Sequence, residues 1–147
     1  MLFRNVRMHA AGHDSAIQHV RFLPSSSVSD NGGQIASSSG DATIKIWDVK
    51  TKSNTATLSG HASEVAQFEC FTNNTMASIS GDNSSKVWDV RKPGGAVHSN
   101  NDCCAADANL SCMALFPDGD QMIWVRSTPS RTPLPVVTAS MQRAWGH

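Results

Sequence analysis

An internal repeat is the feature that most constrains how this 147-residue chain can fold. The segment at 35–48 reads IASSSGDATIKIWD, and the segment at 76–89 reads MASISGDNSSKVWD. A Gly-His pair precedes each segment, at residues 12–13 and again at 60–61. The Trp-Asp pairs are 41 residues apart and the Gly-His pairs are 48 residues apart. Self-similarity at a spacing of about 40–45 residues predicts equivalent supersecondary units that pack side by side.

A pattern of apolar residues precedes the polar part of each repeat and occurs a third time further along the chain. The three sets are Ile17, Val20, Phe22 and Leu23, then Val65, Phe68, Cys70 and Phe71, then Leu110, Met113, Leu115 and Phe116. The third copy has Ala105 and Ala106 where the Gly-His pair should stand. The longer spacing of the Gly-His pairs places seven extra residues in the polar, glycine-rich stretch 25–33, which we interpret as a long exposed turn or a binding loop.

The residues between the turn and the Trp-Asp pair have the period of a β-strand. Ile44 and Ile46 alternate with Thr43, Lys45 and Trp47, and no segment has a helical apolar period over three turns. Gly-His at one end and Trp-Asp at the other, at this spacing, resembles the WD-repeat family. The resemblance implies an all-β fold of antiparallel four-stranded blades, and 147 residues are too few for a closed ring of about 4–8 blades. We therefore predict an incomplete β-propeller.

The domain organisation follows from these spacings. Residues 1–125 are expected to form the partial propeller, with blades at about 12–58 and 60–99 and an incomplete blade at 105–125. Residues 126–147 are expected to form an irregular tail, because three prolines between 129 and 135 cannot donate to a strand ladder. We interpret this tail as the product of altered splicing in a truncated isoform, with a proline-rich partner-binding tail as the alternative.

The resemblance also implies a structural hydrogen-bond network in each repeat, joining a histidine, a strand serine, the turn aspartate and the tryptophan. The glycine before each turn aspartate, Gly40 or Gly81, is expected to have a positive φ. The residues of the two networks are His13, Ser37 or Ser39, Asp41 and Trp47, then His61, Ser78 or Ser80, Asp82 and Trp88.

A serine, a histidine and an aspartate also invite comparison with a hydrolase triad. A nucleophilic triad should occur once, in a cleft beside an oxyanion hole, whereas this set occurs twice at the spacing of the repeat. The pattern therefore favours a structural network and predicts that the protein is not an enzyme.

Composition narrows the range of partners. Twelve basic and twelve acidic residues cancel, so no electrostatic footprint for direct nucleic-acid binding is visible. The four cysteines, Cys70, Cys103, Cys104 and Cys112, form no C-x-x-C pair, so neither a metal nor a cofactor is predicted. No signal peptide or membrane-length apolar run is visible, and no small-molecule substrate is predicted. We expect an intracellular location, with the nucleus favoured over the cytoplasm.

The predicted function is that of a non-enzymatic scaffold that holds other protein subunits in a complex. Within the WD-repeat family, the second and third repeats resemble the WD-repeat subunit of the THO complex, which implies a role in mRNA processing and nuclear export. The alternative is a substrate receptor of a cullin-type ubiquitin ligase, since Trp88, Asp89, Val90 and Arg91 match the Trp-Asp-x-Arg motif of such receptors, with Arg91 as the candidate partner contact. A truncated isoform without function of its own is the third possibility.

Overall fold

The computed structural model describes residues 12–24, 33–72, 74–92, 94–101, 109–115, 121–128 and 136–143. Within these ranges the chain forms eleven β-strands and no helix. The strands make two four-stranded sheets and one three-stranded sheet, in which strands adjacent in sequence pair antiparallel. The polar loop 25–33 lies outside the described residues except for Gly33.

The first sheet contains the first repeat. Its strands are β1 (Ile17–Phe22), β2 (Gln34–Ser39), β3 (Thr43–Asp48) and β4 (Ser53–Ser59), hydrogen-bonded in that order. A register shift between Ile17 and His19 bends the start of β1. In β3 the side chains of Ile44 and Ile46 are completely buried, as their alternation predicted.

The second sheet repeats the first. It contains β5 (Val65–Cys70), β6 (Thr75–Ser80), β7 (Ser85–Asp89) and the short edge strand β8 (His98–Asn100). Its register shift, between Val65 and Gln67, falls at the position equivalent to that in β1. The two sheets therefore match in irregularity as well as in strand order.

The third sheet differs from the sequence prediction at its C-terminal end. It contains β9 (Asn109–Leu115), β10 (Gln121–Thr128) and β11 (Val136–Arg143). The tail was expected to be irregular, yet β10 continues past residue 125 and β11 pairs with it from Gln121↔Arg143 to Thr128↔Val136. The prolines lie between these strands, outside the described residues, and the eight residues of β11 contain none, so every β11 position keeps its backbone donor.

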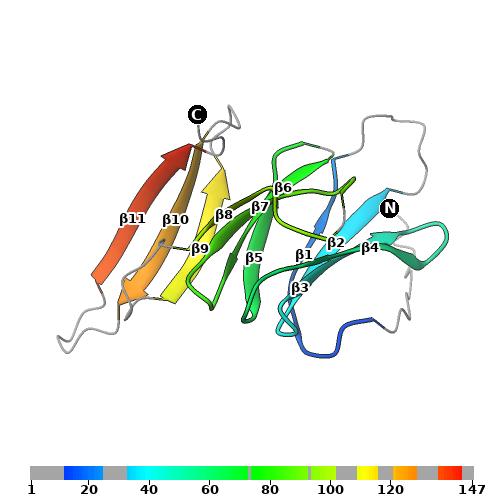
Figure 1. Cartoon of the computed structure of the whole chain (residues 1–147), viewed down its shortest axis with the longest axis horizontal. Coiled ribbons are helices and arrows are strands. Elements are labelled where there is room, and N and C mark those ends of the chain that lie inside the picture. The colour runs from blue at the N-terminus through cyan, green and yellow to red at the C-terminus, as the bar shows by residue number, and fades with distance from the viewer. Residues whose placement is uncertain are drawn as a thin grey trace, which may run out of the picture.

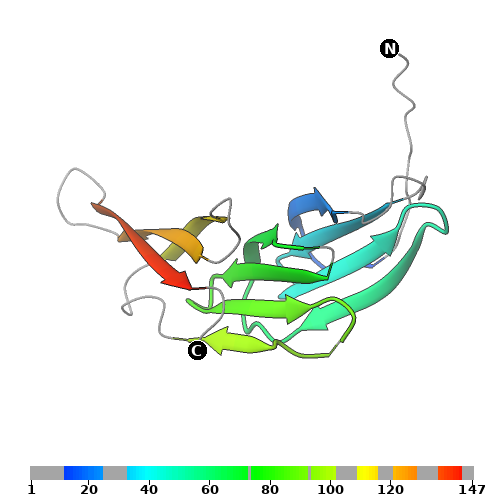
Figure 2. The ribbon, with the colours of Figure 1, turned by 90° about the horizontal axis from the view of Figure 1, so that it is seen from above.

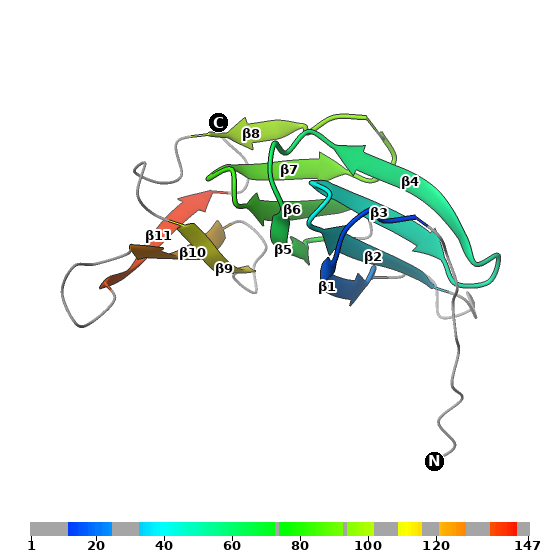
Figure 3. The same cartoon turned by 90° about the horizontal axis from the view of Figure 1, so that it is seen from below.

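The three sheets stand side by side in an open arc (Figure 1). Figures 2 and 3 show the first strand of each sheet toward one side of the arc, with β4 and β8 at the opposite side. Strand β5 contacts β1 and β2 of the preceding sheet and β9 of the following one. The described sheets do not close into a ring, which confirms the prediction of an incomplete propeller.

The hydrophobic core lies between the first and second sheets. Phe68 and Val65 of β5 are completely buried against the first sheet, and so is Met76 of β6. Burying a large apolar side chain contributes about 1.5–3 kcal/mol, so this contact is a main source of stability. The remaining members of the cluster are Leu23, Ala36, Ile44, Ile46, Leu58 and Trp88.

The turn between the second and third strands departs from the expected backbone geometry. The residues with positive φ are Ala42 (φ 66°) and Asn83 (φ 62°), rather than Gly40 and Gly81. The two glycines instead lie close to a serine side chain, because a Cβ on Gly40 would lie 2.7 Å from Ser15 Oγ and one on Gly81 3.2 Å from the corresponding serine hydroxyl. Asparagine tolerates the left-handed region, whereas alanine adopts it at a cost of roughly 1–2 kcal/mol.

Replacing Ala42 with glycine should therefore stabilise the chain by about 0.5–1 kcal/mol, because glycine has no Cβ to strain at positive φ. Chemical denaturation of the two proteins measures this difference. Ala56→Gly in β4 is the matched control, and the same exchange in a strand should cost about 0.5–1 kcal/mol. Equal effects at the two positions would contradict the strain at Ala42.

Candidate functional site

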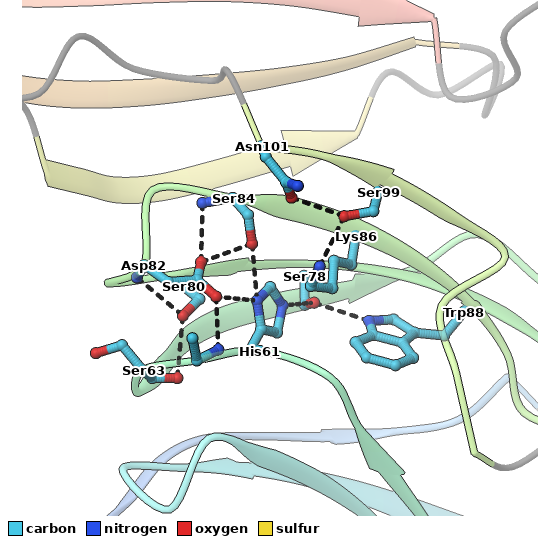
Figure 4. A network of polar contacts seen from close by, with 11 residues as sticks. His61, Ser63, Ser78, Ser80, Asp82, Ser84, Lys86, Trp88, Ser99 and Asn101 are labelled. Atoms are coloured by element: carbon cyan, nitrogen blue, oxygen red, sulfur yellow. Dashed lines mark hydrogen bonds and ion pairs between the residues drawn. The ribbon is translucent and has the colours of Figure 1, made fainter.

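The second repeat contains a continuous chain of hydrogen bonds that runs from a buried indole to a carboxylate (Figure 4). The Trp88 indole Nε1 donates to Ser78 Oγ over 2.8 Å. Ser78 Oγ lies 2.8 Å from Nε2 of His61, and Nδ1 of His61 lies 3.1 Å from Asp82 Oδ2. These residues come from β7, β6, the segment before β5 and the turn between β6 and β7. The chain thus ties β6, β7 and the turn between them to the segment before β5.

The donors and acceptors of this chain fit one arrangement of protons. A carboxylate only accepts, so His61 Nδ1 carries the proton that is donated to Asp82. In a neutral imidazole the other nitrogen is an acceptor, so Ser78 donates its hydroxyl proton to Nε2 while accepting from the indole. Each polar atom of the buried chain is therefore satisfied without a net charge on the histidine.

The first repeat has the same arrangement. His13 Nδ1 lies 2.8 Å from Asp41 Oδ2, and His13 Nε2 lies 2.8 Å from Ser37 Oγ. The Trp47 indole donates to Ser37 Oγ over 2.8 Å. The histidine and tryptophan rings meet edge to face, with centroids 6.1 Å apart here and 5.8 Å apart in the second repeat. The structure therefore chooses Ser37 and Ser78 from the serine pairs that the sequence left open.

The other two serines of those pairs have a different role. Ser39 Oγ donates to the carbonyl of Ser15 over 3.1 Å, and Ser80 Oγ donates to the carbonyl of Ser63 over 3.0 Å. Each hydroxyl also accepts from the backbone N–H of the turn aspartate, at 3.2 Å. They hold the turn against the segment that enters the first strand.

Each turn aspartate receives more donors than the sequence revealed. Asp82 accepts from the backbone N–H of Ala62 (2.8 Å) and from both the N–H (2.9 Å) and the hydroxyl (2.6 Å) of Ser84. Asp41 is bound in the same way by Asp14 N–H (3.1 Å) and by Thr43 (3.0 and 2.7 Å). Sequence reasoning missed Thr43 and Ser84, although a hydroxyl residue two positions after the aspartate in both repeats was a usable signal.

These donors set the ionisation of the network. Burial raises the pKa of Asp82, but the hydrogen bonds from Ser84 and Ala62 outweigh burial and bring the pKa well below its usual range. The pKa of Asp41 is likewise well below its usual range, since hydrogen bonds from Thr43 and His13 outweigh burial. Burial lowers the pKa of the His61 imidazole, and its neighbour Lys86 adds to this effect.

A buried lysine makes a separate set of hydrogen bonds beside the second network. Lys86 is 9% exposed, and its Nζ donates to Ser99 Oγ over 2.7 Å (Figure 4). Ser99 in turn donates to Asn101 Oδ1 over 2.9 Å. These bonds join β7 to the edge strand β8, and the repeat could not predict them because Ser99 lies outside the repeated segment.

The glycine of each Gly-His pair lies against the tryptophan ring. A Cβ on Gly12 would meet Trp47 Cη2 at 2.3 Å, so the ring or the backbone would have to move. Gly60 has φ +150°, and a Cβ there would lie 3.4 Å from Trp88 Cη2. In each Gly-His pair, the glycine therefore lets the backbone approach the indole closely, and the histidine supplies the hydrogen bonds of its imidazole.

The geometry explains why the Ser-His-Asp sets are structural. The Ser78 side chain is completely buried and Ser37 is 3% exposed, so neither hydroxyl can reach a substrate without opening the blade. Each serine also accepts from a tryptophan, a bond that a nucleophile in a triad does not need. The arrangement stabilises a fold.

Arg91 occupies an exposed position after β7. Its Nε and Nη2 donate to Asp89 Oδ1 and Oδ2 over 3.0 and 2.8 Å, and its side chain is 67% exposed. The Arg91 guanidinium lowers the pKa of Asp89 to about 2. Asp48 of the first repeat instead accepts from the backbone N–H groups of Lys50 and Thr51. The paired carboxylate orients the Arg91 guanidinium at the surface.

The cysteines are the remaining residues with reactive side chains that the sequence analysis considered. Burial raises the pKa of the Cys70 thiol to about 11, so it packs as a small apolar group, and Cys112 is exposed. Cys103 and Cys104 lie outside the described residues. Across the described ranges, no cluster of histidine, cysteine and acidic side chains is arranged to hold a metal ion. A helix long and apolar enough to cross a membrane is also absent from these ranges.

Comparison with known families agrees with this architecture. Residues 5–48 match the model of the WD domain, G-beta repeat. The repeated Gly-His and Trp-Asp network and the four-stranded sheets agree with this match, so the chain is similar to WD-repeat proteins.

Several relatives are nuclear distribution proteins. The chain is 41% identical over 61 residues to the nuclear distribution protein PAC1 of Coccidioides posadasii, a segment that covers 40% of this chain and 13% of that protein. It is 40% identical over 62 residues to the PAC1 of Gibberella zeae, covering 41% and 13%. It is 38% identical over 65 residues to that of Arthroderma otae, covering 43% and 14%. The match thus spans about a seventh of each relative's length.

A pair of serine substitutions tests the network. Ser78→Ala leaves the Trp88 indole and the His61 Nε2 without their partner, and should cost about 1–3 kcal/mol of unfolding free energy. Ser38 is the matched control, because it is also completely buried but its Oγ has no hydrogen-bond partner among the described residues. Its register equivalent in the second repeat is Ile79.

Ser38→Ala should therefore be neutral or stabilising, since it removes an unpaired buried hydroxyl. Urea denaturation followed by tryptophan fluorescence measures both variants. A similar loss for the two serines would show that the hydroxyl chain contributes no more than packing volume.

The lowered pKa values predict how stability depends on pH. The unfolded imidazole of His61 takes up its proton at about pH 6.5, before the folded one, so stability should fall as pH drops below 6.5. The stabilisation from Asp41 and Asp82 is present above their unfolded pKa of 3.8 and is lost below it. Unfolding free energies measured across this range at fixed ionic strength should show both declines.

His61→Asn should reduce the decline that begins at pH 6.5 and leave the part due to His19, whose pKa burial also lowers, whereas His98→Gln, at an exposed histidine in β8, should preserve the whole decline. An unchanged pH profile in the His61 variant would contradict a neutral buried imidazole.

Proposed function

We propose that the protein is a non-enzymatic scaffold whose WD repeats bind other protein subunits in a complex. The observation that carries the proposal is the duplicated Trp-Ser-His-Asp chain. It directs the polar side chains of both repeats into the fold, at matching distances in each, and leaves recognition to exposed residues and turns. WD repeats generally serve as platforms for protein–protein contact, which agrees with this division of roles.

Arg91 is the exposed residue that we propose as a partner contact. Arginine is enriched at interaction hot spots, where a planar guanidinium with restricted motion makes several directed hydrogen bonds. The bidentate contact with Asp89 holds the guanidinium in one orientation at the surface. This geometry favours the ligase-receptor hypothesis, which relies on the Trp-Asp-x-Arg motif, as the second candidate function.

The identity of the partner complex is the more specific part of the proposal. The relatives described above carry a nuclear-distribution name, and none of them is a THO subunit. We propose protein subunits as the partner class, with a nuclear-distribution assembly, the THO complex and a cullin-type ligase as the three identities to separate. An intracellular, preferably nuclear, location stays part of the proposal.

Affinity capture from a lysate with the tagged 147-residue chain, followed by mass spectrometry, tests the proposal. Arg91→Ala should reduce recovery of the specific partner about tenfold, equivalent to about 1.4 kcal/mol of binding free energy. Lys50→Ala is the matched control, because Lys50 stands at the equivalent exposed place of the first repeat. An exposed ion pair contributes little stability, so neither change should unfold the chain.

The identity of the captured proteins separates the hypotheses. Cullin-adaptor proteins would support the ligase receptor, and THO subunits or nuclear-distribution proteins would support the corresponding scaffold. Equal recovery with both variants would remove Arg91 from the contact but leave the scaffold in place. Recovery of no protein above the background of an untagged sample would contradict the scaffold itself.

A further inference from the structure

The first sheet has an apolar face that nothing in the described structure covers. Ile17, Val20 and Phe22 of β1 are 58%, 50% and 76% exposed, and Ile35, opposite Phe22 in the register, is half-buried. We name these residues the back face of the first sheet. Large apolar groups clustered at one exposed site are typical of an interaction surface.

The equivalent residues of the second sheet are buried. Val65, Phe68 and Met76 are completely buried, and Cys70 packs against the same cluster. They correspond to Ile17, Val20, Ile35 and Phe22 by the 48-residue and 41-residue spacings and by register. The chemistry of the two faces is alike, so the difference is that the first sheet covers the back face of the second.

The contact that covers a back face occurs twice along the chain. The His19 ring of the first sheet meets the Phe68 ring of the second edge to face, with centroids 5.1 Å apart. Gln67, at the position equivalent to His19, accepts from the Met113 N–H (3.1 Å) and donates to its carbonyl (2.9 Å). Met113 of β9 is 4% exposed and is equivalent to Phe68. The same strand positions therefore meet at both junctions.

In the third sheet, the positions equivalent to those that cover the next sheet's back face are exposed. Cys112 is equivalent to His19 and Gln67, and both Cys112 and Ala114 are exposed. Ile123 of β10 pairs with Ala114 in the register and is half-buried. We name these three residues the open face of the third sheet. These three residues are uncharged, as are the residues of the back face of the first sheet.

We propose that the back face of the first sheet binds the open face of the third sheet of a second copy of this chain, in a head-to-tail contact. Both halves of the junction are present on one molecule, and the same strand positions already meet at two junctions within the chain. The contact is heterologous, so it closes into a ring if the rotation permits and otherwise continues as a chain of copies. It places Cys112 of one copy against Val20 of the next.

A substitution at Val20 tests this contact. Val20→Asp should raise the dissociation constant for self-association at least tenfold, measured by sedimentation velocity of the whole chain over a concentration series. Val97→Asp is the matched control, because Val97 is 49% exposed but lies before β8, away from both faces. It should leave self-association unchanged. Circular dichroism confirms that each variant keeps its strands.

Disulfide trapping gives a second readout that does not depend on Val20→Asp folding. Val20→Cys, oxidised with diamide, should form an intermolecular disulfide between position 20 and Cys112, identified by peptide mass spectrometry. Adding Cys112→Ser should abolish this bond, and Val97→Cys should not form one with Cys112.

Three results would overturn the proposal. These are a chain that stays monomeric throughout the concentration series, self-association equally weakened by Val20→Asp and Val97→Asp, or trapping of position 20 to position 20 instead of Cys112. The last would indicate that two back faces meet each other.

Discussion

The burial of one indole per repeat is the constraint on which the rest of the structure depends. Trp88 is 1% exposed, and its N–H would be costly to bury without an acceptor. Ser78 supplies that acceptor, His61 accepts the serine proton, and Asp82 fixes the imidazole. Each partner comes from a different part of the blade, so satisfying the indole fixes the strands and the turn together. Buried networks of this kind stabilise a unique arrangement only when every member is paired.

The two repeats both bury an indole, but they differ in the backbone strain of the turn and in the residues of the core. The second has Asn83 at positive φ and Ile79 in the core, where the first has Ala42 and the unpaired hydroxyl of Ser38. Trp88 also belongs to the core cluster between the sheets, whereas Trp47 lies outside it. The first repeat therefore combines an intact network with a less favourable turn and core, so its stability depends more on the hydrogen bonds and on its neighbours.

The sequence predicted the all-β blades because the repeat is local and its period is unambiguous. It could not choose Ser37 over Ser39, since residues two apart in a strand point to the same face and only the three-dimensional arrangement shows which one meets the histidine. It misplaced the positive φ at Gly40 because glycine is as useful for space as for conformation. It did not predict β11 because the prolines before that strand are typical of irregular structure. The eight residues that follow them contain no proline and pair with β10.

Burial in this chain is a property of neighbouring sheets as much as of residues. Val20 and Phe68 are both apolar and occupy the same strand position, yet one is half exposed and the other completely buried. In arrays of repeats the stability of each unit includes the interface with the next, so an uncovered face lacks a term that the other units have. An assembly that covers the back face of the first sheet would supply that term through the junction that the chain already contains. The polar network would be unaffected, because it lies within each blade and already has its partners.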